Sequence, residues 1–365
     1  MKKILFLVTA CKSRGPIQQT LNIIKNLDRS IFEPHLVTIY PEEKDSHLDE
    51  YLLYVKHHYV PIGKIDILLN RTSKLRRVLE EINPDVIHSL GVFPDFAVSR
   101  MKRWKQVITL RNYIYEDFPA KFGKLKGGML AQIHLYAMQH TAKTVTCSES
   151  LARIYKEKLG LSFDFIRNGV DVEQYSKSTL EEKTKIRKEL NIPQRAFVYV
   201  YTGQMIERKN VSFLLDTFAE NIKSPNAYLL LLGDGPLLES YKVKYGSIEN
   251  IDFRGNVSNV NHYLKACDAY VSTSTSEGLP NGVLEAMATG LPVVLSDIVQ
   301  HLEIFEANKE IGRLYRQGDM KDLVKQLLLV EKEAESFGKM AYKSAHENFS
   351  AKGMSKKYQK IYNSI

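Results

Sequence analysis

The chain has little cysteine and no long apolar run. Its three cysteines, Cys11, Cys147 and Cys267, lie far apart, and no two of them form a Cys-x-x-Cys pair. The sequence therefore predicts neither a disulfide framework nor a zinc site, and it suits a reducing cytoplasm. No segment approaches the roughly 18 consecutive apolar residues that a membrane span needs, so we expect no membrane-crossing helix.

Signatures of other protein classes are missing as well. Residues 232–236 read Leu-Gly-Asp-Gly-Pro after an apolar run, but Leu238 stands where a dinucleotide fingerprint would have its third glycine. We find no short-period repeat, no low-complexity segment, and no helix-turn-helix, RNA-recognition or zinc signature. A dinucleotide site is therefore not supported, and sequence-specific nucleic-acid binding has no motif behind it.

Excess positive charge is confined to the first half of the chain. Residues 1–170 contain 26 Lys and Arg against 17 Asp and Glu, whereas residues 171–365 contain 25 of each kind. The formal net charge of +9 thus belongs to the first half. This favours an anionic partner there, such as a membrane surface, a phosphorylated lipid carrier or nucleic acid. The alternative is that these residues only keep this half soluble.

Length and pattern together predict the fold. A chain of 365 residues exceeds the size at which one core usually stops growing, so we expect two domains. The strands expected in the first half are Lys3–Thr9, His35–Tyr40, Asp85–Leu90, Gln106–Leu110 and Thr144–Thr146. Those expected in the second half are Phe197–Tyr201, Ala227–Leu232, Ile251–Phe253, Ala269–Ser272 and Pro292–Ser296. Helical patterns alternate with them, which predicts an α/β fold of two Rossmann-like, doubly wound domains with a ligand cleft between them.

The domain limits follow from a change in composition. Residues 176–189 are polar and charged, and they indicate a linker that contains a helix. We therefore predict a first domain over residues 1–172 and a second over residues 190–345. The last segment, residues 346–365, is predicted to be helical, because Tyr358, Ile361 and Tyr362 would share one apolar face.

The stretch Ser272–Val294 says most about function. It follows the apolar Ala269–Val271, passes through small polar residues and enters a helix near Asn281. The first turn of such a helix offers backbone N–H groups to an anion. Glu277 in the loop and Glu285 on the second turn add two acceptors for hydroxyl groups. A phosphate and several hydroxyls are the groups that a nucleotide-sugar carries.

The same stretch resembles the donor-site signature of retaining glycosyltransferases of family 4, which have two Rossmann-like domains in the GT-B arrangement. Gly-Leu-Pro follows Glu277, seven residues separate it from Glu285, and Ala-Met-Ala-Thr-Gly-Leu-Pro-Val follows Glu285. The resemblance implies an acceptor domain and a nucleotide-sugar donor domain that face each other across a cleft. It also implies that the helix of residues 346–365 crosses back onto the first domain.

The resemblance implies roles for single residues. Residues 203–209, Gly-Gln-Met-Ile-Glu-Arg-Lys, are similar to a family element whose Arg and Lys neutralise the donor diphosphate. Gln204 stands at the family's Arg position, and we expect Arg208 to supply the charge. The expected catalytic residues are Glu277, which would orient the sugar hydroxyls, and Arg208 and Lys209. Glu285 would hold the ribose. The donor-binding residues implied are Gly15, Gly203, Gly235, Asn256, Val257, Gly278, Leu279, Pro280, Asn281, Gly282, Val283 and Glu285.

Three residues of the first half are candidates for acceptor or sugar contacts. Ser13 lies in Ser-Arg-Gly-Pro, which resembles the family's Gly-Gly loop before its first helix. Arg111 stands where the family has a His that contacts the donor sugar, so that this contact is changed or absent here. His88 follows a predicted strand, and its alternative is a structural role inside the domain.

The implied reaction retains the configuration at the anomeric carbon without a protein nucleophile, and the leaving diphosphate takes the acceptor proton. The chain contains no Asp-x-Asp, with which single-domain, metal-dependent glycosyltransferases hold a cation, and His57-His58 is isolated. We therefore expect a hexosyltransferase that needs no metal and no cofactor.

A basic and partly apolar surface is expected on the acceptor side. Residues 100–105 place the only Trp, Trp104, among Arg and Lys, and residues 119–130 indicate a flexible basic loop. Aromatic and basic residues together suit an anionic membrane surface. The alternative is a solvated helix end beside a mobile loop.

The function expected is transfer of a sugar from a nucleotide-sugar, UDP-linked by preference, to a hydroxyl of a glycan or of a polyprenyl-diphosphate-linked glycan. This would serve cell-surface polysaccharide biosynthesis, either lipopolysaccharide or capsule, in the cytoplasm and peripherally at the inner face of the plasma membrane. The alternative is a polyanion or nucleic-acid binding protein with a nucleotide-binding fold. We expect no nucleic acid as partner.

Overall fold

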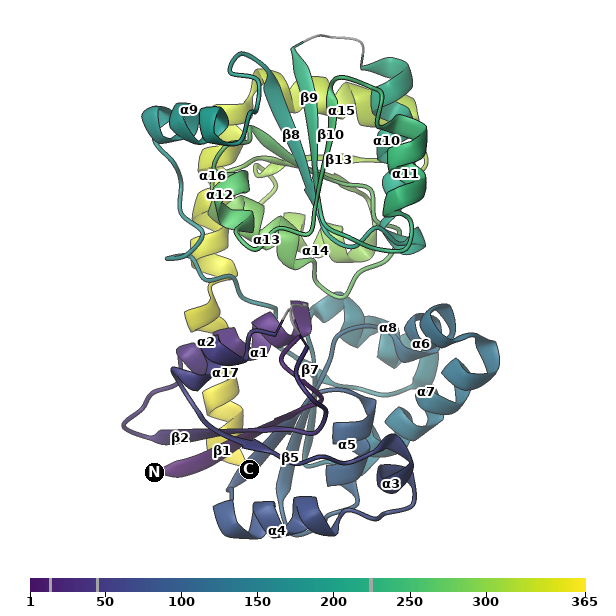
Figure 1. Cartoon of the computed structure of the whole chain (residues 1–365), viewed down its shortest axis with the longest axis vertical. Helices are drawn as coiled ribbons and strands as arrows, with labels where there is room; N and C mark the ends of the chain where they lie inside the picture. The colour runs from purple at the N-terminus through teal and green to yellow at the C-terminus, as the bar shows by residue number, and fades with distance from the viewer. Residues whose placement is uncertain (13–14, 44–45, 223–225) are drawn as a thin grey trace. The chain divides into compact units, whose positions relative to one another are not determined.

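The computed structural model describes residues 1–12, 15–43, 46–222 and 226–365. The chain forms two compact units (Figure 1). The first unit consists of Met1–Gly169 together with Ala351–Ile365, and the second of Val170–Ser350. Each unit is built around one sheet whose neighbouring strands run parallel. The expected pair of Rossmann-like α/β domains is thus confirmed.

The first sheet has the strand order β3-β2-β1-β4-β5-β6-β7. Its strands are β1 Lys2–Val8, β2 Phe32–Thr38, β3 Lys56–Tyr59, β4 Val86–Ser89, β5 Lys105–Leu110, β6 Lys143–Thr146 and β7 Asp164–Phe165. Central β1 is buried on both faces, as its unbroken apolar sequence requires. The order reverses between β1 and β4, which makes this the point where ligands of such sheets bind.

Nine helices of the described residues belong to the first unit. They are α1 Gly15–Lys25, α2 Leu48–Leu52, α3 Lys64–Leu68, α4 Ser73–Ile82, α5 Val92–Ser99, α6 Ile114–Phe122, α7 Lys124–Gln139, α8 Glu149–Leu159 and α17 Ala351–Ser364. Helix α17 comes from the end of the chain. Its Met354, Tyr358 and Tyr362 are buried in the same core as Phe6 of β1, and its Ser355 hydroxyl donates to the Ile23 carbonyl at 2.9 Å. The C-terminal helix is therefore an integral part of the first unit.

The second sheet has the strand order β10-β9-β8-β11-β12-β13. Its strands are β8 Phe197–Thr202, β9 Ala227–Leu232, β10 Ile251–Gly255, β11 Ala269–Ser272, β12 Val293–Ser296 and β13 Gly312–Tyr315. The helical segments are α9 Leu180–Glu189, the 3-10 turn η1 Glu207–Lys209, α10 Val211–Asn221, α11 Leu238–Tyr245, α12 Val260–Leu264, α13 Asn281–Ala288, α14 Val299–Ala307, α15 Met320–Lys332 and α16 Ala334–Asn348. Here the order reverses between β8 and β11.

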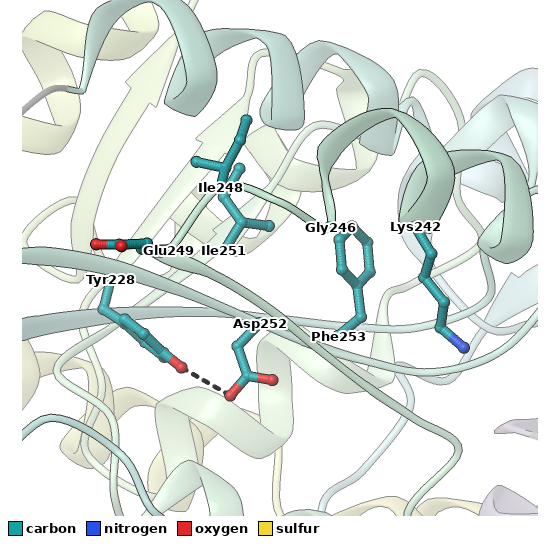
Figure 2. A pocket seen from close by; sticks show the side chains of 8 residues that line it. All are labelled: Tyr228, Lys242, Gly246, Ile248, Glu249, Ile251, Asp252 and Phe253. Carbon is teal, nitrogen blue, oxygen red and sulfur yellow. Dashed lines mark hydrogen bonds between the residues drawn. The ribbon is translucent and has the colours of Figure 1, made fainter.

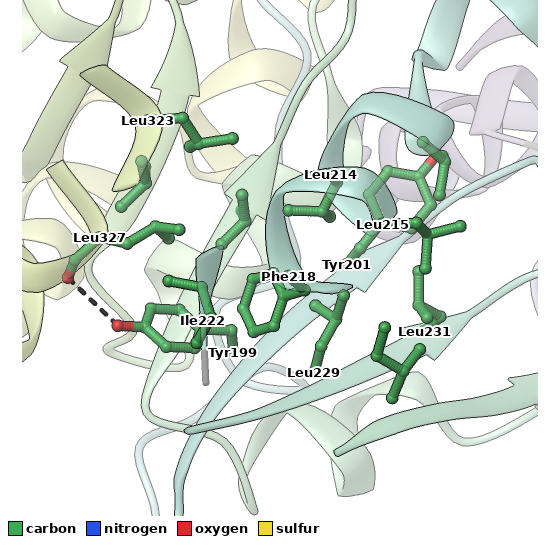
Figure 3. Close-up of a cluster of buried hydrophobic side chains, with 14 of the residues drawn as sticks. Tyr199, Tyr201, Leu214, Leu215, Phe218, Ile222, Leu229, Leu231, Leu323 and Leu327 are labelled. Atoms are coloured by element: carbon green, nitrogen blue, oxygen red, sulfur yellow. Dashed lines mark hydrogen bonds between the residues drawn. The ribbon is translucent and has the colours of Figure 1, made fainter. Parts of the chain in front are cut away.

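A dense apolar core fixes the strands of the second unit. Figure 3 shows Tyr199 of β8 and Leu229 of β9 packed with Phe218 of α10 and Leu327 of α15. The Tyr199 hydroxyl donates to the Leu327 carbonyl at 3.2 Å, which satisfies the one polar group of the ring. Burial of a side chain of this size stabilises the fold by about 1.5–3 kcal/mol. The same core contains Tyr201 of β8 and Val271 of β11, so both strands are anchored close to the loops that follow them.

Two expectations about the first unit were wrong. Residues 119–130 form the end of α6 and the start of α7 rather than a loop. The Trp104 ring is 8% exposed and packs in the apolar core with Met101, so it does not lie at the surface. The neighbouring Arg103 guanidinium covers the ring at 5.3 Å from its centre, because a long basic side chain keeps its charge in water while its stem lies on apolar surface.

Among the residues that the structure describes, none of the helices combines the length and the apolar character that a membrane crossing needs.

Candidate active site

The candidate site lies where the second sheet reverses. The loop after β8 runs through Gly203–Asn210, and the loop after β11 runs through Thr273–Pro280. Because β8 and β11 pair in parallel, both loops leave the sheet at the same edge. The Thr275 N–H donates to the Arg208 carbonyl at 2.8 Å, and the Thr273 hydroxyl donates to the Asn210 carbonyl at 2.9 Å. These bonds join the two loops into one surface.

Glu277 is the centre of this surface. Its side chain is 5% exposed, and its carboxylate accepts from Arg208 Nη1 at 3.0 Å, from the Ser274 hydroxyl at 2.7 Å and from Lys209 Nζ. Burial acts to raise the pKa of Glu277, but the Lys209 and Arg208 charges outweigh it and lower the pKa to about 2. Glu277 is therefore ionised at neutral pH, and it can only accept hydrogen bonds.

The two cations come from one short turn. Arg208 and Lys209 belong to η1, and the turn ends at Asn210, whose φ of 49° lies in the left-handed region that Asn tolerates. Burial lowers the pKa of Lys209 below its ordinary value, and the nearby Glu277 carboxylate offsets only part of this shift. Arg208 also donates to the Ser276 carbonyl at 2.8 Å, but its buried Nε has no hydrogen-bond partner among the described residues. The two cations thus share the single Glu277 carboxylate, and the Arg208 Nε remains a donor for an anion.

Helix α13 begins directly after this loop. Its N-cap is Pro280, whose own side chain makes no capping bond. A Cβ on Gly282 would lie 2.4 Å from the Thr202 hydroxyl, and the residue must be glycine for the helix to begin so close to β8. The side chains of Val283 and Leu279 are buried in the unit. Gly282 and Val283 can therefore contact a ligand only through their backbone, whereas the side chain of the half-buried Asn281 stays accessible.

Glu285 lies one turn further along α13. It is half-buried, and burial alone raises the pKa of its carboxyl to about 7. That carboxyl group forms no hydrogen bond with any other described residue. A half-buried carboxyl group without a partner is suited to accept hydrogen bonds from a ligand.

The remaining predicted donor residues of the second unit also follow the carboxyl ends of its strands. Gly203 follows β8 and Gly235 follows β9, and a Cβ on Gly235 would lie 2.6 Å from the Met205 carbonyl oxygen. This close approach holds the loop after β9 against the loop after β8. Asn256 is exposed and Val257 is half-buried, both directly after edge strand β10. Like Glu277 they follow the carboxyl end of a strand, but β9 lies between β10 and β8 in the sheet.

The first-unit candidates fall into separate surroundings. Ser13 lies outside the described residues, and Gly15 is the first residue of α1. Arg111 donates from Nη1 to the Asn168 side-chain oxygen at 2.5 Å, and its buried Nε has no partner among the described residues. His88 pairs with the Tyr362 hydroxyl at 2.7 Å and the Thr109 hydroxyl at 2.9 Å.

The geometry around His88 favours the structural alternative. Both ring nitrogens are engaged, the residue is buried, and burial together with the Arg111 charge lowers its pKa to about 3. A ring that joins β4, β5 and α17 in this way has no free nitrogen for a sugar hydroxyl.

A cavity of about 510 Å³ lies elsewhere in the second unit, at edge strand β10 and α11 (Figure 2). Its lining residues are Tyr228, Lys242, Gly246, Ile248, Glu249, Ile251, Asp252 and Phe253. The Tyr228 hydroxyl donates to the Asp252 carboxylate at 2.8 Å. None of the lining residues is a predicted site residue, so we do not take this cavity as the active site.

Sequence reasoning missed three buried polar residues that support the site: Ser274, Ser296 and His301. Ser274 bonds Glu277 directly, Ser296 bonds Ser274, and His301 bonds Ser296. The small polar run around Ser274 was visible in the sequence, but a single His on a helix gives no signal of its own.

Two family models match the chain. Residues 15–174 match the one described as Glycosyltransferase Family 4, and residues 182–346 match the one described as Glycosyl transferases group 1. Together they span most of both units.

Relatives and solved structures agree with these matches. The O-antigen biosynthesis glycosyltransferase WclY of Escherichia coli is 24% identical over 377 residues, which cover 100% of this chain and 98% of the relative. The UDP-Gal:alpha-D-GlcNAc-diphosphoundecaprenol alpha-1,3-galactosyltransferase of Escherichia coli is 28% identical over 306 residues, 79% of this chain and 70% of the relative. Alr3699/HepE of Anabaena, solved in complex with UDP-glucose, has a TM-score of 0.84 at 19% identity, with 100% of both chains covered.

The structural likeness shows a shared GT-B fold. Both halves of the chain match glycosyltransferase models, and the Glu277 and Glu285 elements occupy one edge of the second sheet. The chain belongs to the family 4 glycosyltransferases.

Proposed function

We propose that this glycosyltransferase moves a hexose from a UDP-sugar to a hydroxyl of a glycan or a polyprenyl-diphosphate-linked glycan, with retention and without a metal ion. One observation carries the proposal: Glu277 holds Arg208 and Lys209 on a single buried surface, with the Arg208 Nε still to be satisfied. A diphosphate supplies the acceptor oxygens and the negative charge that this surface lacks.

The diphosphate is bound by charge and by the backbone. Arg208 and Lys209 neutralise it. The backbone N–H groups in the first turn of α13 donate hydrogen bonds to it, because the N-terminus is the positive end of the helix dipole. These groups act most strongly on the leaving diphosphate, whose charge grows as the bond to the sugar breaks. This chain offers the two cations and the helix where other enzymes use a bound cation.

Glu277 and Glu285 bind hydroxyl groups in different protonation states. Ionised Glu277 accepts hydrogen bonds from the sugar, and it is too weak a base to take a proton at neutral pH. Glu285 has no competing partner and would accept from the ribose hydroxyls. The carboxylate pair thereby fixes the sugar and the nucleoside on either side of the diphosphate.

In the proposed step the bond between the anomeric carbon and the phosphate oxygen breaks. The acceptor oxygen bonds to the same face of that carbon, and the acceptor proton passes to the leaving phosphate oxygen. Charges and atoms balance without a protein nucleophile. The residues of this chain contribute position and charge stabilisation.

The donor and acceptor classes rest on the relatives. The galactosyltransferase named above uses a UDP-sugar and a diphosphoundecaprenol-linked acceptor, and HepE was solved with UDP-glucose. WclY is named for O-antigen biosynthesis. By this analogy the protein would act in cell-surface polysaccharide biosynthesis at the cytoplasmic face of a membrane.

Helices α6 and α7 provide a surface suited to an anionic membrane. Phe122, Leu125 and Met129 are exposed at 47%, 93% and 56%. Lys121, Lys124 and Lys126 are exposed beside them, and the Lys126 ammonium lies 5.8 Å from the centre of the Phe122 ring. Apolar residues that enter the interface and Lys that meets lipid phosphates form such a contact. A lipid-linked acceptor would be presented at that surface.

The test is a panel of UDP-glucose, UDP-galactose, UDP-N-acetylglucosamine and GDP-mannose, with release of the nucleoside diphosphate as readout. We expect release from one UDP-sugar, increased by a polyprenyl-diphosphate-linked glycan, and loss of release in Glu277→Ala. Release from GDP-mannose alone would contradict the UDP assignment, and release unaffected in Glu277→Ala would contradict the proposed site.

A further inference from the structure

His301 is connected to the candidate site by hydrogen bonds through Ser296 and Ser274. It belongs to the first turn of α14, which follows β12, and it is completely buried. Burial lowers the pKa of His301 to about 4, and the Glu277 and Lys209 charges act on it in opposite directions. The ring is therefore neutral at neutral pH and close enough to both groups to feel their charges.

The hydrogen bonds around the ring define its tautomer. The Ser296 hydroxyl donates its one proton to the Ser274 carbonyl at 2.6 Å. His301 Nδ1 lies 2.9 Å from the Ser296 carbonyl oxygen and 3.1 Å from the Ser296 hydroxyl oxygen. Both of these oxygens can then only accept, so Nδ1 must carry the proton. The Nε2 atom keeps its lone pair, and it has no partner among the described residues.

These bonds continue to the catalytic carboxylate. The Ser274 carbonyl accepts the hydrogen bond from the Ser296 hydroxyl. The Ser274 hydroxyl donates to the Glu277 carboxylate at 2.7 Å. His301, Ser296, Ser274 and Glu277 are all at most 6% exposed. Water therefore does not compete for these hydrogen bonds. A change at His301 is expected to alter the position of the Glu277 carboxylate.

We propose that His301 is a positioning residue of the transfer site. Through Ser296 and Ser274 it sets where the Glu277 carboxylate lies, and thereby where Arg208 and Lys209 meet the diphosphate. The inference rests on the proposed role of Glu277. A shift of about 1 Å in such a group is enough to cost on the order of a hundredfold in rate.

Two substitutions of His301 separate positioning from simple filling of the core. The amide nitrogen of Asn lies near the place of Nδ1, whereas that of Gln lies near the place of Nε2. His301→Asn keeps the donor to Ser296, and His301→Gln moves it away. We expect His301→Asn to stay within about threefold of the parent kcat, and His301→Gln and Ser296→Ala to lose about ten- to a hundredfold.

The kinetic experiment uses whichever of UDP-glucose, UDP-galactose and UDP-N-acetylglucosamine releases UDP fastest. The loss in kcat should exceed any change in KM or in the calorimetric Kd for UDP, because the charge on the diphosphate grows in the transition state and its alignment with Arg208 and Lys209 matters most there. His301→Gln combined with Ser296→Ala should be no worse than Ser296→Ala alone, since both break one chain of bonds. Thr217→Ala is the control, because Thr217 also carries a fully buried hydroxyl but lies on α10.

The outcomes separate the two proposals. If Glu277→Ala is as active as the parent chain, the proposed site fails. If Glu277→Ala is inactive while His301→Gln and Ser296→Ala turn over normally, only the positioning role of His301 fails. Nitrogen-15 spectra of the His301 ring need no substrate, and we expect protonated Nδ1 and bare Nε2. A ring protonated at Nε2 instead would overturn the inference.

Discussion

Glu285 differs from Glu277 because no cation lies beside it. Burial raises its pKa to about 7, whereas the Arg208 and Lys209 charges bring that of Glu277 to about 2. Two carboxylates eight residues apart on one motif are thus held in opposite ways. We therefore expect Glu285 to affect UDP affinity and the pH dependence of the unfolding free energy in ways that Glu277 does not.

We expect Glu285→Ala to weaken UDP binding by more than tenfold. A hydrogen bond to a charged group contributes about 1.5–3 kcal/mol, and the ribose offers two hydroxyls to one carboxylate. Calorimetric titration with UDP at pH 8 measures the effect. Exposed Glu239→Ala, on α11, serves as the control. An unchanged Kd would remove Glu285 from the nucleotide site.

Glu285 should also make stability depend on pH. A carboxyl whose pKa is raised by folding binds more protons in the folded chain, so stability is lost as pH rises from about 4.5 toward about 7 and is level above that. Glu285→Gln removes this dependence. In urea denaturation at pH 5, 6, 7 and 8, the variant should gain on the parent chain up to pH 7, by roughly 1–3 kcal/mol. A constant difference at all four values would contradict the raised pKa.

Helix α17 shows how an element distant in sequence completes a core. Tyr362 bonds His88 at 2.7 Å, and Tyr358 bonds Thr109 at 2.8 Å, both in buried surroundings. Tyr362→Phe keeps the ring and removes the bond, which leaves one His88 nitrogen unpaired. We expect a loss of about 1–2 kcal/mol in unfolding free energy. Exposed Tyr59→Phe is the control. Equal stability of the two variants would show that His88 does not need this partner.

Helices α6 and α7 make a prediction about membrane binding. Replacing Lys121, Lys124 and Lys126 with Gln should weaken co-sedimentation with anionic vesicles by about 1 kcal/mol per engaged residue. Binding of the parent chain should fade with salt, because the field is screened within about 10 Å at 0.1 M. The matched control replaces Lys321, Lys325 and Lys332, which are exposed on α15. Equal loss in both triple variants would reduce the effect to net charge alone.

Elements that follow one strong pattern could be predicted from the sequence. The apolar run of β1 and the loop and helix around Glu277 needed no knowledge of distant residues. The surroundings of Trp104, His88 and His301 did need it, because their partners are set by tertiary packing rather than by local pattern. The basic segment 119–130 was misjudged because its three glycines outweighed its helical pattern, although α6 and α7 pack together and support each other.

At the scale of the whole molecule, the two halves carry different chemistry. The first half holds the positive excess, and the second holds the site with its two cations around Glu277. If these cations and α13 neutralise the diphosphate, transfer should proceed with 5 mM EDTA present, within about twofold of the rate without it. UDP release with and without EDTA, then with added magnesium or manganese, measures this. A complete loss that magnesium or manganese restores would contradict metal independence.

The central claim is that Arg208 and Lys209 stabilise the departing diphosphate. The most direct measurement is kcat for UDP release, together with the calorimetric Kd for UDP, in Arg208→Ala and Lys209→Ala. Because the negative charge grows in the transition state, kcat should fall by more than tenfold and by a larger factor than UDP affinity. If both variants keep the parent kcat, or lose only UDP affinity, the two cations do not carry the reaction and the account is wrong.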